Sequence, residues 1–245
     1  MNTKSARTVI IIPTFNEQAS IGHVLDAIPM EYRNPVIVVD NGSTDATAAI
    51  AAKHCAIVIH EPRRGYGSAC LAGIAHAKVF SPDVHVFLDG DYSDYPEDLP
   101  NLLDALNDQN LDLVIGSRML GLAEKGALLP QARFGNWLAT QLMAIRYRYR
   151  FTDLGPFRAI RTKALEQLQM ADTNFGWTME MQVKALRSGL HVGEVPVRYR
   201  KRIGESKISG TISGSVAAGI KILWTLGRYS FPHAQKPKQY ETHVG

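Results

Sequence analysis

Cysteine is scarce in this chain, whose 245 residues include only Cys55 and Cys70. Two cysteines at these positions show neither a disulfide framework nor the spacing of a metal site. Their scarcity fits a protein of the reducing cytoplasm, where disulfides are rare. The class of small secreted domains held together by disulfides is therefore excluded.

Long apolar runs are missing as well. A membrane-spanning helix needs about 20 consecutive apolar residues, and the nearest candidate, Ile212–Phe231, is interrupted by Lys221 and Arg228. The first apolar run, Val9–Ile12, is short and stops at Pro13, so no signal peptide is predicted. The sequence therefore predicts neither a membrane-spanning nor a secreted protein.

The chain also lacks a strong charge of either sign. It has 27 Lys and Arg against 23 Asp and Glu, a formal net charge of +4. This excess is too small to indicate a nucleic-acid partner, but it is compatible with anionic substrates or an anionic membrane surface. With 45% hydrophobic and 20% charged residues, the composition is that of an ordinary globular protein. We expect one domain over residues 1–230 and a polar C-terminal tail over residues 231–245.

Short apolar runs alternate with segments of helical periodicity in the first half of the chain. Short, β-branched runs are typical of buried parallel strands, and apolar residues three or four apart are typical of helices. The predicted strands are Thr8–Ile12, Pro35–Val39, Ala56–His60, Val84–Leu88 and Leu113–Ile115. The predicted helices are Ser20–Ile28, Ala46–His54, Ser68–Lys78 and Pro96–Asn107. This alternation predicts an α/β fold with a mostly parallel sheet and helices on both faces.

The second half changes character. It contains a predicted amphipathic helix over Phe134–Ile145, a loop and short strand over Thr152–Arg161, and a helix over Phe175–Ser188. Extended segments follow over His191–Arg200, split by Pro196. A C-terminal amphipathic helix is predicted over Ser213–Arg228.

Polar clusters directly follow the first four predicted strands. They are Thr14–Glu17, Asp40–Asp45, Arg63–Tyr66 and Asp89–Asp91. In a parallel sheet, ligands bind beyond the carboxyl ends of the strands. We therefore expect these four clusters to lie together along one edge of the sheet.

The cluster Asp89-Gly90-Asp91 is the best candidate for a metal site. Alternate side chains of an extended segment point the same way, so the two carboxylates can face one point. Gly90, between them, has no side chain to obstruct a ligand. Paired carboxylates form a hard oxygen site for Mg²⁺ or Mn²⁺. The alternative is a simple turn at the end of a strand, since Asp and Gly are favoured there.

Several motifs together resemble one family. PTFNE follows the first strand, VDNGSTD the second and DGD the fourth, as in the family 2 glycosyltransferases of GT-A (Rossmann-like) fold. Later motifs resemble the polyprenyl-phosphate sugar transferases, the dolichol-phosphate mannosyltransferase-like branch: GSR, TDLGPFRA, GWTMEMQVKA and VPVRYRKRIGESK. The resemblance extends from about residue 8 to residue 229.

The resemblance implies an inverting transfer of a hexose from a UDP- or GDP-sugar to a polyprenyl phosphate at the membrane surface. It also implies a nucleotide diphosphate sugar as donor and Mg²⁺ or Mn²⁺ as cofactor, with Asp89 and Asp91 as metal ligands. The residues expected to line the donor nucleotide are Pro13, Thr14, Glu17 and Asp40, together with Arg63, Arg64 and Gly65 in the loop that closes over it.

On the acceptor side, the resemblance assigns Arg118, Arg202 and Lys207 to the phosphates, which suits the planar fork of arginine. Asp153 matches an aspartate near the acceptor, where it would act as a base, orient the acceptor or only form a turn. Together with Asp91, these are the expected catalytic residues. Glu180, on an apolar helix, has either a direct role or a salt bridge to an arginine of the site, because a buried carboxylate is costly unless paired.

Some residues depart from the family pattern, and alternatives stay open. Tyr92-Ser93-Asp94 follows the metal motif where Gln or His is frequent, and Tyr66 stands where Lys is frequent. The alternatives are a family 2 transferase with a soluble or protein acceptor, and a sugar-nucleotide-binding module without catalysis. A nucleotidyltransferase would need a Gly-rich loop in place of PTFNE.

A peripheral membrane contact is predicted from two amphipathic segments, Phe134–Ile145 and Val216–Tyr229, and from the basic and aromatic Arg146–Arg150. The expected location is the cytoplasm, including the inner face of the cell membrane. Packing of these helices on their own domain is the alternative. The sequence also leaves room for a homo-oligomer.

Overall fold

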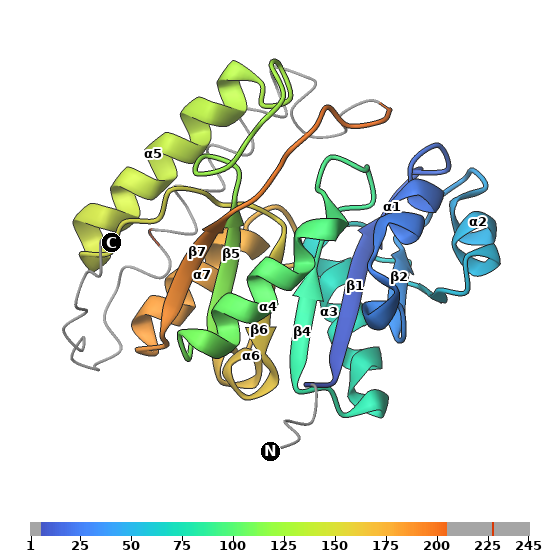
Figure 1. Cartoon of the computed structure of the whole chain (residues 1–245), viewed down its shortest axis with the longest axis horizontal. Helices are drawn as coiled ribbons and strands as arrows, with labels where there is room; N and C mark the ends of the chain where they lie inside the picture. Colours follow the sequence, from blue (N-terminus) through green and yellow to red (C-terminus); the bar gives the residue numbers. More distant parts are fainter. Residues whose placement is uncertain (1–5, 205–226, 228–245) are drawn as a thin grey trace.

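The computed structural model describes residues 6–204 and 227, and within them it contains seven strands and seven α-helices (Figure 1). The strands are β1 (Thr8–Thr14), β2 (Val36–Asp40), β3 (Ile57–His60), β4 (Val84–Phe87), β5 (Leu113–Ser117), β6 (Arg158–Arg161) and β7 (Val192–Pro196). The helices are α1 (Ile21–Ala27), α2 (Thr47–Lys53), α3 (Tyr66–Ala77), α4 (Leu99–Asp108), α5 (Pro130–Tyr147), α6 (Thr162–Leu168) and α7 (Trp177–Arg187). Short 3₁₀ helices are η1 (Met30–Tyr32), η2 (Lys78–Phe80) and η3 (Pro96–Asp98).

The strands form one sheet in the order β3-β2-β1-β4-β6-β5-β7. β6 runs antiparallel to its neighbours β4 and β5, and the other pairs are parallel. In β1, the central strand of the parallel part, all seven residues are buried. A strand covered on both faces can be apolar throughout, which explains the run Val9–Ile12. The expected mostly parallel sheet is confirmed.

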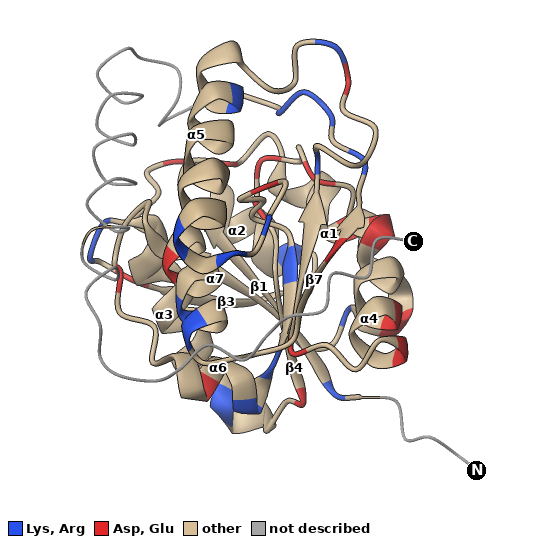
Figure 2. Ribbon diagram, turned by 90° about the vertical axis from the view of Figure 1, so that its left-hand side faces the viewer, with Lys and Arg blue, Asp and Glu red and all other residues tan. Residues whose placement is uncertain are grey.

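Helices cover both faces of this sheet. One core packs the sheet against α1, α2 and α4, and the other packs it against α3, α5, α6 and α7. Figure 2 shows α3, α5, α6 and α7 on one side of the strands and α4 on the other. Ile10 and Ile12 of β1 enter the first core, whereas Val9 and Ile11 enter the second, because successive side chains of a strand point to opposite faces.

The helices predicted within the described residues are present, with ends shifted by one to four residues. Helix α6, of seven residues, was not predicted. The short strand predicted within Thr152–Arg161 is β6, but its antiparallel place between β4 and β5 was not foreseen. The predicted helix Ser213–Arg228, except Gly227, and the tail over residues 231–245 lie outside the described residues.

Candidate active site

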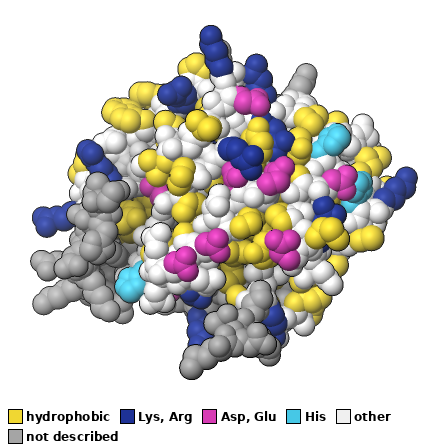
Figure 3. Space-filling model, viewed as in Figure 1, with side chains coloured by type: hydrophobic (Ala, Val, Ile, Leu, Met, Phe, Trp, Pro, Cys, Tyr) yellow, Lys and Arg dark blue, Asp and Glu magenta, His cyan; other side chains and the backbone are white. Residues whose placement is uncertain are grey.

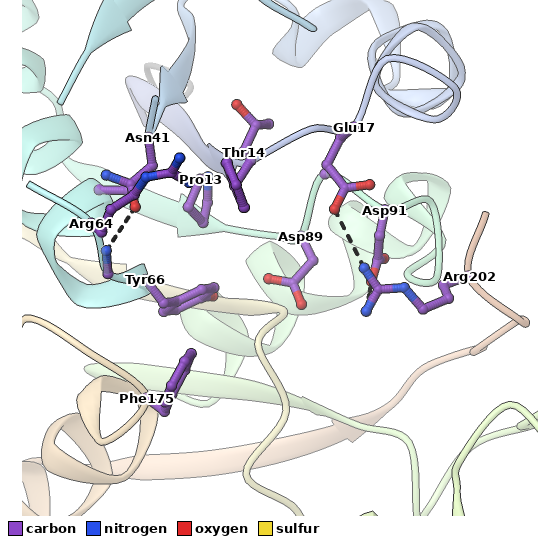
Figure 4. Close-up of a pocket in the computed structure, with 14 residues that line it drawn as sticks. Pro13, Thr14, Glu17, Asn41, Arg64, Tyr66, Asp89, Asp91, Phe175 and Arg202 are labelled. Atoms are coloured by element: carbon purple, nitrogen blue, oxygen red, sulfur yellow. Dashed lines mark hydrogen bonds and ion pairs between the residues drawn. The ribbon is translucent and has the colours of Figure 1, made fainter. Parts of the chain in front are cut away.

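A cavity of about 400 Å³ opens at the carboxyl edge of the parallel strands, where the polar clusters were expected to meet (Figure 4). It lies among the ends of β1, β2 and β4 and the first turn of α3. Its walls also include two residues from later in the chain, Phe175 and Arg202. The remaining lining residues are Pro13, Thr14, Phe15, Glu17, Asn41, Arg64, Gly65, Tyr66, Ala69, Asp89, Gly90 and Asp91.

The Asp89–Asp91 turn forms part of the cavity wall. Gly90 is required there, because a Cβ at this position would lie 2.7 Å from Cγ2 of Thr14. Asp91 is held in place by the backbone N–H of Ser93, which donates to Oδ1 over 2.9 Å. Asp89 Oδ1 is buried and has no hydrogen-bond partner among the described residues. Two carboxylates thus face one cavity, one oriented by the turn and one with an unused oxygen.

Arg202 joins this turn from the far end of the described chain. Its Nη1 lies 3.3 Å from Asp91 Oδ2 and its Nη2 lies 3.4 Å from Glu17 Oε1. Figure 4 shows its guanidinium group between these two carboxylates. Arg202 was predicted to act on phosphates, and the structure places it beside Asp91, at the wall of the same cavity.

Asn41 organises the loop that carries Arg64 and Gly65. Its Nδ2 donates to the carbonyl oxygens of Glu61 and Arg63, over 2.9 Å and 2.7 Å, and its Oδ1 accepts the N–H of Gly65 over 2.8 Å. Sequence reasoning missed this role and included Asn41 only as part of the polar cluster Asp40–Asp45. The available signal was an asparagine directly after the carboxyl end of a strand.

This loop packs tightly against the segment 171–175. A Cβ at Gly65 would lie 2.1 Å from the carbonyl oxygen of Thr173, and one at Gly67 would lie 2.0 Å from that of Asp172. Only glycine permits such an approach of two backbones. The segment then places Phe175 on the cavity wall, near Tyr66 (Figure 4), and Arg64 stacks on Phe15 at 3.7 Å from the ring centroid.

Two residues predicted for the nucleotide do not line the cavity. Asp40 is buried behind it, where Oδ1 accepts the N–H of Ser43 and Oδ2 lies 3.2 Å from Nδ1 of His60. Arg63 is exposed and pairs with Glu61 over 3.1 Å. Pro13, Thr14, Glu17, Arg64 and Gly65, in contrast, line the cavity.

Arg118 and Asp153, both assigned to the acceptor side, form one buried ion pair. The guanidinium group of Arg118 binds both carboxylate oxygens of Asp153 at 2.7 Å, and the backbone N–H of Arg118 adds a third bond. The side chain of Asp153 is 0% exposed. Its carboxylate therefore serves to hold Arg118, and neither residue lines the 400 Å³ cavity.

Glu194 supports this pair from β7, which sequence reasoning did not anticipate. Its carboxylate accepts the backbone N–H groups of Thr152 and Asp153. Burial raises the pKa of Glu194 to about 7, despite these hydrogen bonds. Glu180, for which a direct role was an alternative, is structural: it pairs with Lys184 over 2.8 Å and accepts the N–H of Asp172 over 2.8 Å.

Two further arginines flank Arg202 on the same extended segment. Arg198 pairs with Asp98 over 2.6 Å. The guanidinium carbon of Arg200 lies 3.7 Å and 3.6 Å from the ring centroids of Tyr92 and Tyr95. Arg198 and Arg200 therefore contact residues 92–98, which follow Asp91, whereas Arg202 contacts Asp91 itself. Lys207, the remaining predicted phosphate ligand, lies outside the described residues.

The carboxylate oxygens of this cavity fit a divalent cation that also binds a substrate. Within residues 6–204 and 227, no three His, Cys, Asp or Glu side chains come together as a complete metal site. Mg²⁺ is frequently bound by one or two carboxylates plus substrate phosphates. Asp89 and Asp91, with an unpartnered oxygen on Asp89, supply such a partial site.

The Asp89 carboxyl gives this site a testable pH dependence. Burial, and then the Asp91 carboxylate, raise the pKa of Asp89 to about 7, against the opposing effects of the Tyr66 hydroxyl, Arg202 and Arg118. In the unfolded chain its pKa is about 3.9. Between these values the folded protein holds more protons, so this group makes the metal-free protein less stable as pH rises from about 4 to about 7.

Metal binding must release that proton, so the affinity for Mn²⁺ is expected to rise about tenfold per pH unit up to about pH 7 and then level off. Isothermal titration with Mn²⁺ between pH 5 and 8 measures this. Glu194→Gln is the control, because Glu194 is a second carboxyl with a pKa of about 7 but lies outside the cavity. The dependence of its Mn²⁺ affinity on pH is expected to match that of the wild type. A flat profile would contradict the assignment.

Comparison with known proteins identifies the family of this chain. Residues 9–169 match Glycosyl transferase family 2, so the chain belongs to this family. An uncharacterized glycosyltransferase of Mycobacterium tuberculosis is 41% identical over 212 residues, covering 85% of this chain and 93% of the relative. An undecaprenyl-phosphate mannosyltransferase of Micrococcus luteus is 31% identical over 229 residues, covering 87% and 92%.

The fold has a solved counterpart. Glucosyl-3-phosphoglycerate synthase of Mycobacterium tuberculosis, crystallised with Mn²⁺, UDP and glucosyl-3-phosphoglycerate, superimposes with a TM-score of 0.74 at 23% identity. The match covers 94% of this chain and 82% of that protein. The fold is therefore that of the GT-A glycosyltransferases, and the chain is a glycosyltransferase with polyprenyl-phosphate sugar transferases among its relatives.

Proposed function

We propose that this glycosyltransferase moves a hexose, with inversion, from a UDP- or GDP-sugar to a polyprenyl phosphate, and that it needs Mg²⁺ or Mn²⁺. The observation that carries the proposal is the cavity in which Asp89 and Asp91 meet Arg202 at the carboxyl edge of the sheet. The undecaprenyl-phosphate mannosyltransferase among the relatives supports the acceptor class.

Each part of the donor has a matching part of the cavity. The aromatic side chains of Phe15, Tyr66 and Phe175 offer planar surfaces for the nucleotide, and Arg64 adds a positive charge. Asp89 and Asp91 would hold the metal, which stabilises negative charge on the departing diphosphate. Arg202, already beside Asp91, offers two N–H groups to phosphate oxygens.

A phosphate acceptor explains why no free base is needed near the cavity. Its oxygen is already anionic and attacks without losing a proton, whereas an alcohol would require a positioned base. Asp153 does not supply one, since both its oxygens bind Arg118. The buried pair instead holds the Arg118 guanidinium in a fixed position, where its charge acts on Asp89.

The direct test is a transfer assay with Mn²⁺ or Mg²⁺. UDP- and GDP-hexoses are each incubated with undecaprenyl phosphate, and with undecaprenol as the matched acceptor without phosphate. Formation of a lipid-linked sugar with undecaprenyl phosphate alone is the expected result. Transfer to a soluble or protein acceptor, with none to the lipid phosphate, would favour the soluble-acceptor alternative. Donor binding without transfer or hydrolysis would favour the binding module.

We also propose that the enzyme meets its acceptor as a peripheral protein on the cytoplasmic face of the membrane. No helix within residues 6–204 and 227 is long and apolar enough to cross a bilayer. The segment after Arg118 exposes Leu120 and Leu122, and α5 exposes Phe134 and Trp137. Figure 3 shows hydrophobic and basic side chains together over α5, at the upper left of the view.

This exposed apolar surface, formed by Leu120, Leu122, Phe134 and Trp137, lies on the acceptor side. Its first part begins two residues after Arg118, whose partner is Asp153. Its second part is tied to the same loop, because Asn136 of α5 donates to the carbonyl of Thr152. Aromatic and aliphatic side chains beside cations are what an interfacial surface requires.

Replacing Leu122 and Trp137 by glutamate is expected to abolish co-sedimentation with anionic vesicles, because both side chains are exposed, at 80% and 55%, and a buried carboxylate is costly. Val79→Glu is the matched control, since Val79 is 72% exposed but follows α3 at the opposite edge of the sheet. Binding that is unchanged in the double variant, or that is lost equally in the control, would contradict this surface.

A further inference from the structure

A second cavity, of about 1090 Å³, opens at the opposite edge of the sheet, between α3 and α6. It lies where the parallel strands begin, so it is separate from the donor cavity. Leu71, Ile74 and Met170 give it apolar walls, and His85 of β4 and Thr162 belong to its polar part. Nothing in the proposed reaction uses these residues.

His85 is the unusual feature of this cavity. It is only 2% exposed, and its Nδ1 lies 3.2 Å from the hydroxyl oxygen of Thr162. That hydroxyl donates its one proton to the carbonyl of Pro82 over 2.6 Å, so Nδ1 must carry the hydrogen and Nε2 is a bare acceptor. Nε2 is buried without a hydrogen-bond partner among the described residues.

A buried acceptor without a partner destabilises a fold, and native structures contain few of them. An apolar side chain would pack at the start of β4 without this cost. Burial lowers the pKa of His85 to about 4, so the imidazole is neutral at physiological pH. Neighbouring atoms cover Nε2, so a ligand in the cavity reaches it only when a side chain of the wall moves. Such a ligand must carry a hydrogen-bond donor, such as a hydroxyl.

The charged lining of the cavity has a small excess of cations: Arg7, Lys78, Arg161 and Lys163 against Asp83, Asp112 and Glu166. Arg7 and Asp83 neutralise each other over 3.3 Å, and Arg161 donates to the main-chain carbonyl of Leu111. The ammonium groups of Lys78 and Lys163, in contrast, have no hydrogen-bond or ion-pair partner among residues 6–204 and 227. Lys78, which follows α3, and Lys163, on α6, are exposed cations at this lining with which a dianion such as a phosphate ester can pair.

We propose that this second cavity binds a hydroxylated phosphate ester, with the phosphate at Lys78 and Lys163 and a hydroxyl donating to His85 Nε2. The site is linked to the donor cavity in two ways. Tyr66 and Ala69 of α3 line the donor cavity, whereas Leu71 and Ile74 of the same helix line the second one.

The other link is the segment that follows α6. Gln169 and Met170 line the second cavity, and Phe175 lines the donor cavity. Between them, the carbonyl of Thr173 accepts the N–H of Ser68 in α3 over 2.9 Å. Ligand binding between α3 and α6 is therefore transmitted to the donor cavity by two packed elements.

Calorimetric titration with glucose 6-phosphate tests the site, with glucose and inorganic phosphate as probes that carry only half of the recognised groups. Saturable binding of glucose 6-phosphate, at least about tenfold tighter than either half, is expected. Lys163→Glu, an exposed change on α6, should weaken it about tenfold or more, and His85→Phe should remove the advantage over inorganic phosphate. Arg64→Ala, in the donor cavity, should leave it unchanged.

No saturable binding at millimolar concentration, or equal binding by wild type and Lys163→Glu, would overturn the site; loss of binding in Arg64→Ala would place the ligand in the donor cavity instead. This arm does not depend on the proposed function. A second arm, the Kd of UDP with Mn²⁺ measured with and without glucose 6-phosphate, rests on it. A Kd shift of about threefold or more, absent in Lys163→Glu, supports the link, and an unchanged Kd contradicts it.

Discussion

Replacing Asp91 by alanine is expected to reduce sugar transfer about a hundredfold or more. The residue is 6% exposed, orients the turn through Ser93 and faces the cavity beside Asp89. Without its carboxylate the proposed divalent cation would keep only Asp89 as a protein ligand, and charge on the departing diphosphate would be less stabilised. The loss should appear in kcat and in the apparent affinity for Mn²⁺.

The fold should survive this change. Asp91→Ala removes two hydrogen bonds from Ser93 and one contact with Arg202, which still has Glu17, so the cost in unfolding free energy is about 2 kcal/mol. Thermal unfolding without metal measures it, and Asp108→Ala, an exposed acid at the end of α4, is the matched control. Undiminished activity in Asp91→Ala, or in wild type after exhaustive chelation, would refute metal dependence through this turn.

Replacing Asp153 by alanine should produce the largest loss of stability, about 3–5 kcal/mol. Its carboxylate is fully buried and binds the Arg118 guanidinium, itself only 15% exposed, through both oxygens. Removing it leaves a buried charge without its partner. Urea unfolding of Asp153→Ala measures this loss of unfolding free energy. Asp112→Ala is the comparison, since Asp112 precedes β5 whereas Arg118 follows it.

The double variant Arg118→Met, Asp153→Ala separates stability from chemistry. Replacing both charges by neutral groups removes the uncompensated guanidinium, so the double variant should regain much of the stability lost in Asp153→Ala. Transfer should stay low in both, because each disturbs or removes the positioned Arg118. If Asp153→Ala unfolded like wild type and yet lost transfer to a phosphate acceptor, Asp153 would be acting in the chemistry and not as the anchor of Arg118.

The donor side was largely predictable from the sequence, because local patterns determine it. Apolar runs indicate buried strands such as Thr8–Thr14, and the carboxyl ends of parallel strands lie together at one edge of the sheet. Thr14, Glu17, Asp89 and Asp91 therefore had to meet. The mostly parallel sheet and the helices on both faces followed from the same alternation.

The acceptor side depended on contacts between distant residues, which no local pattern encodes. Arg118 and Asp153 are 35 positions apart, and Arg202 and Glu17 are 185 apart. The sequence allowed Asp153 to be a base, an acceptor-orienting group or a turn residue. Its role in holding Arg118 is visible only in the bidentate contact between the two side chains. Glu194 went unnoticed for the same reason, since its partners are the backbone N–H groups of another loop.

The antiparallel strand β6 has a consequence for how the chain folds. β4 and β5 are consecutive in sequence, but β6 lies between them, and the neighbours of β5 in the sheet are β6 and β7. During synthesis, the four strands β1–β4 can pair with one another first, whereas β5 has no partner until residues 158–161 emerge. Contacts that close such long loops form late and slowly, and a chain stopped before β6 exposes the unpaired edge of β4 to aggregation. Completion of the sheet, and with it the ordering of the acceptor side, must therefore await the last third of the chain.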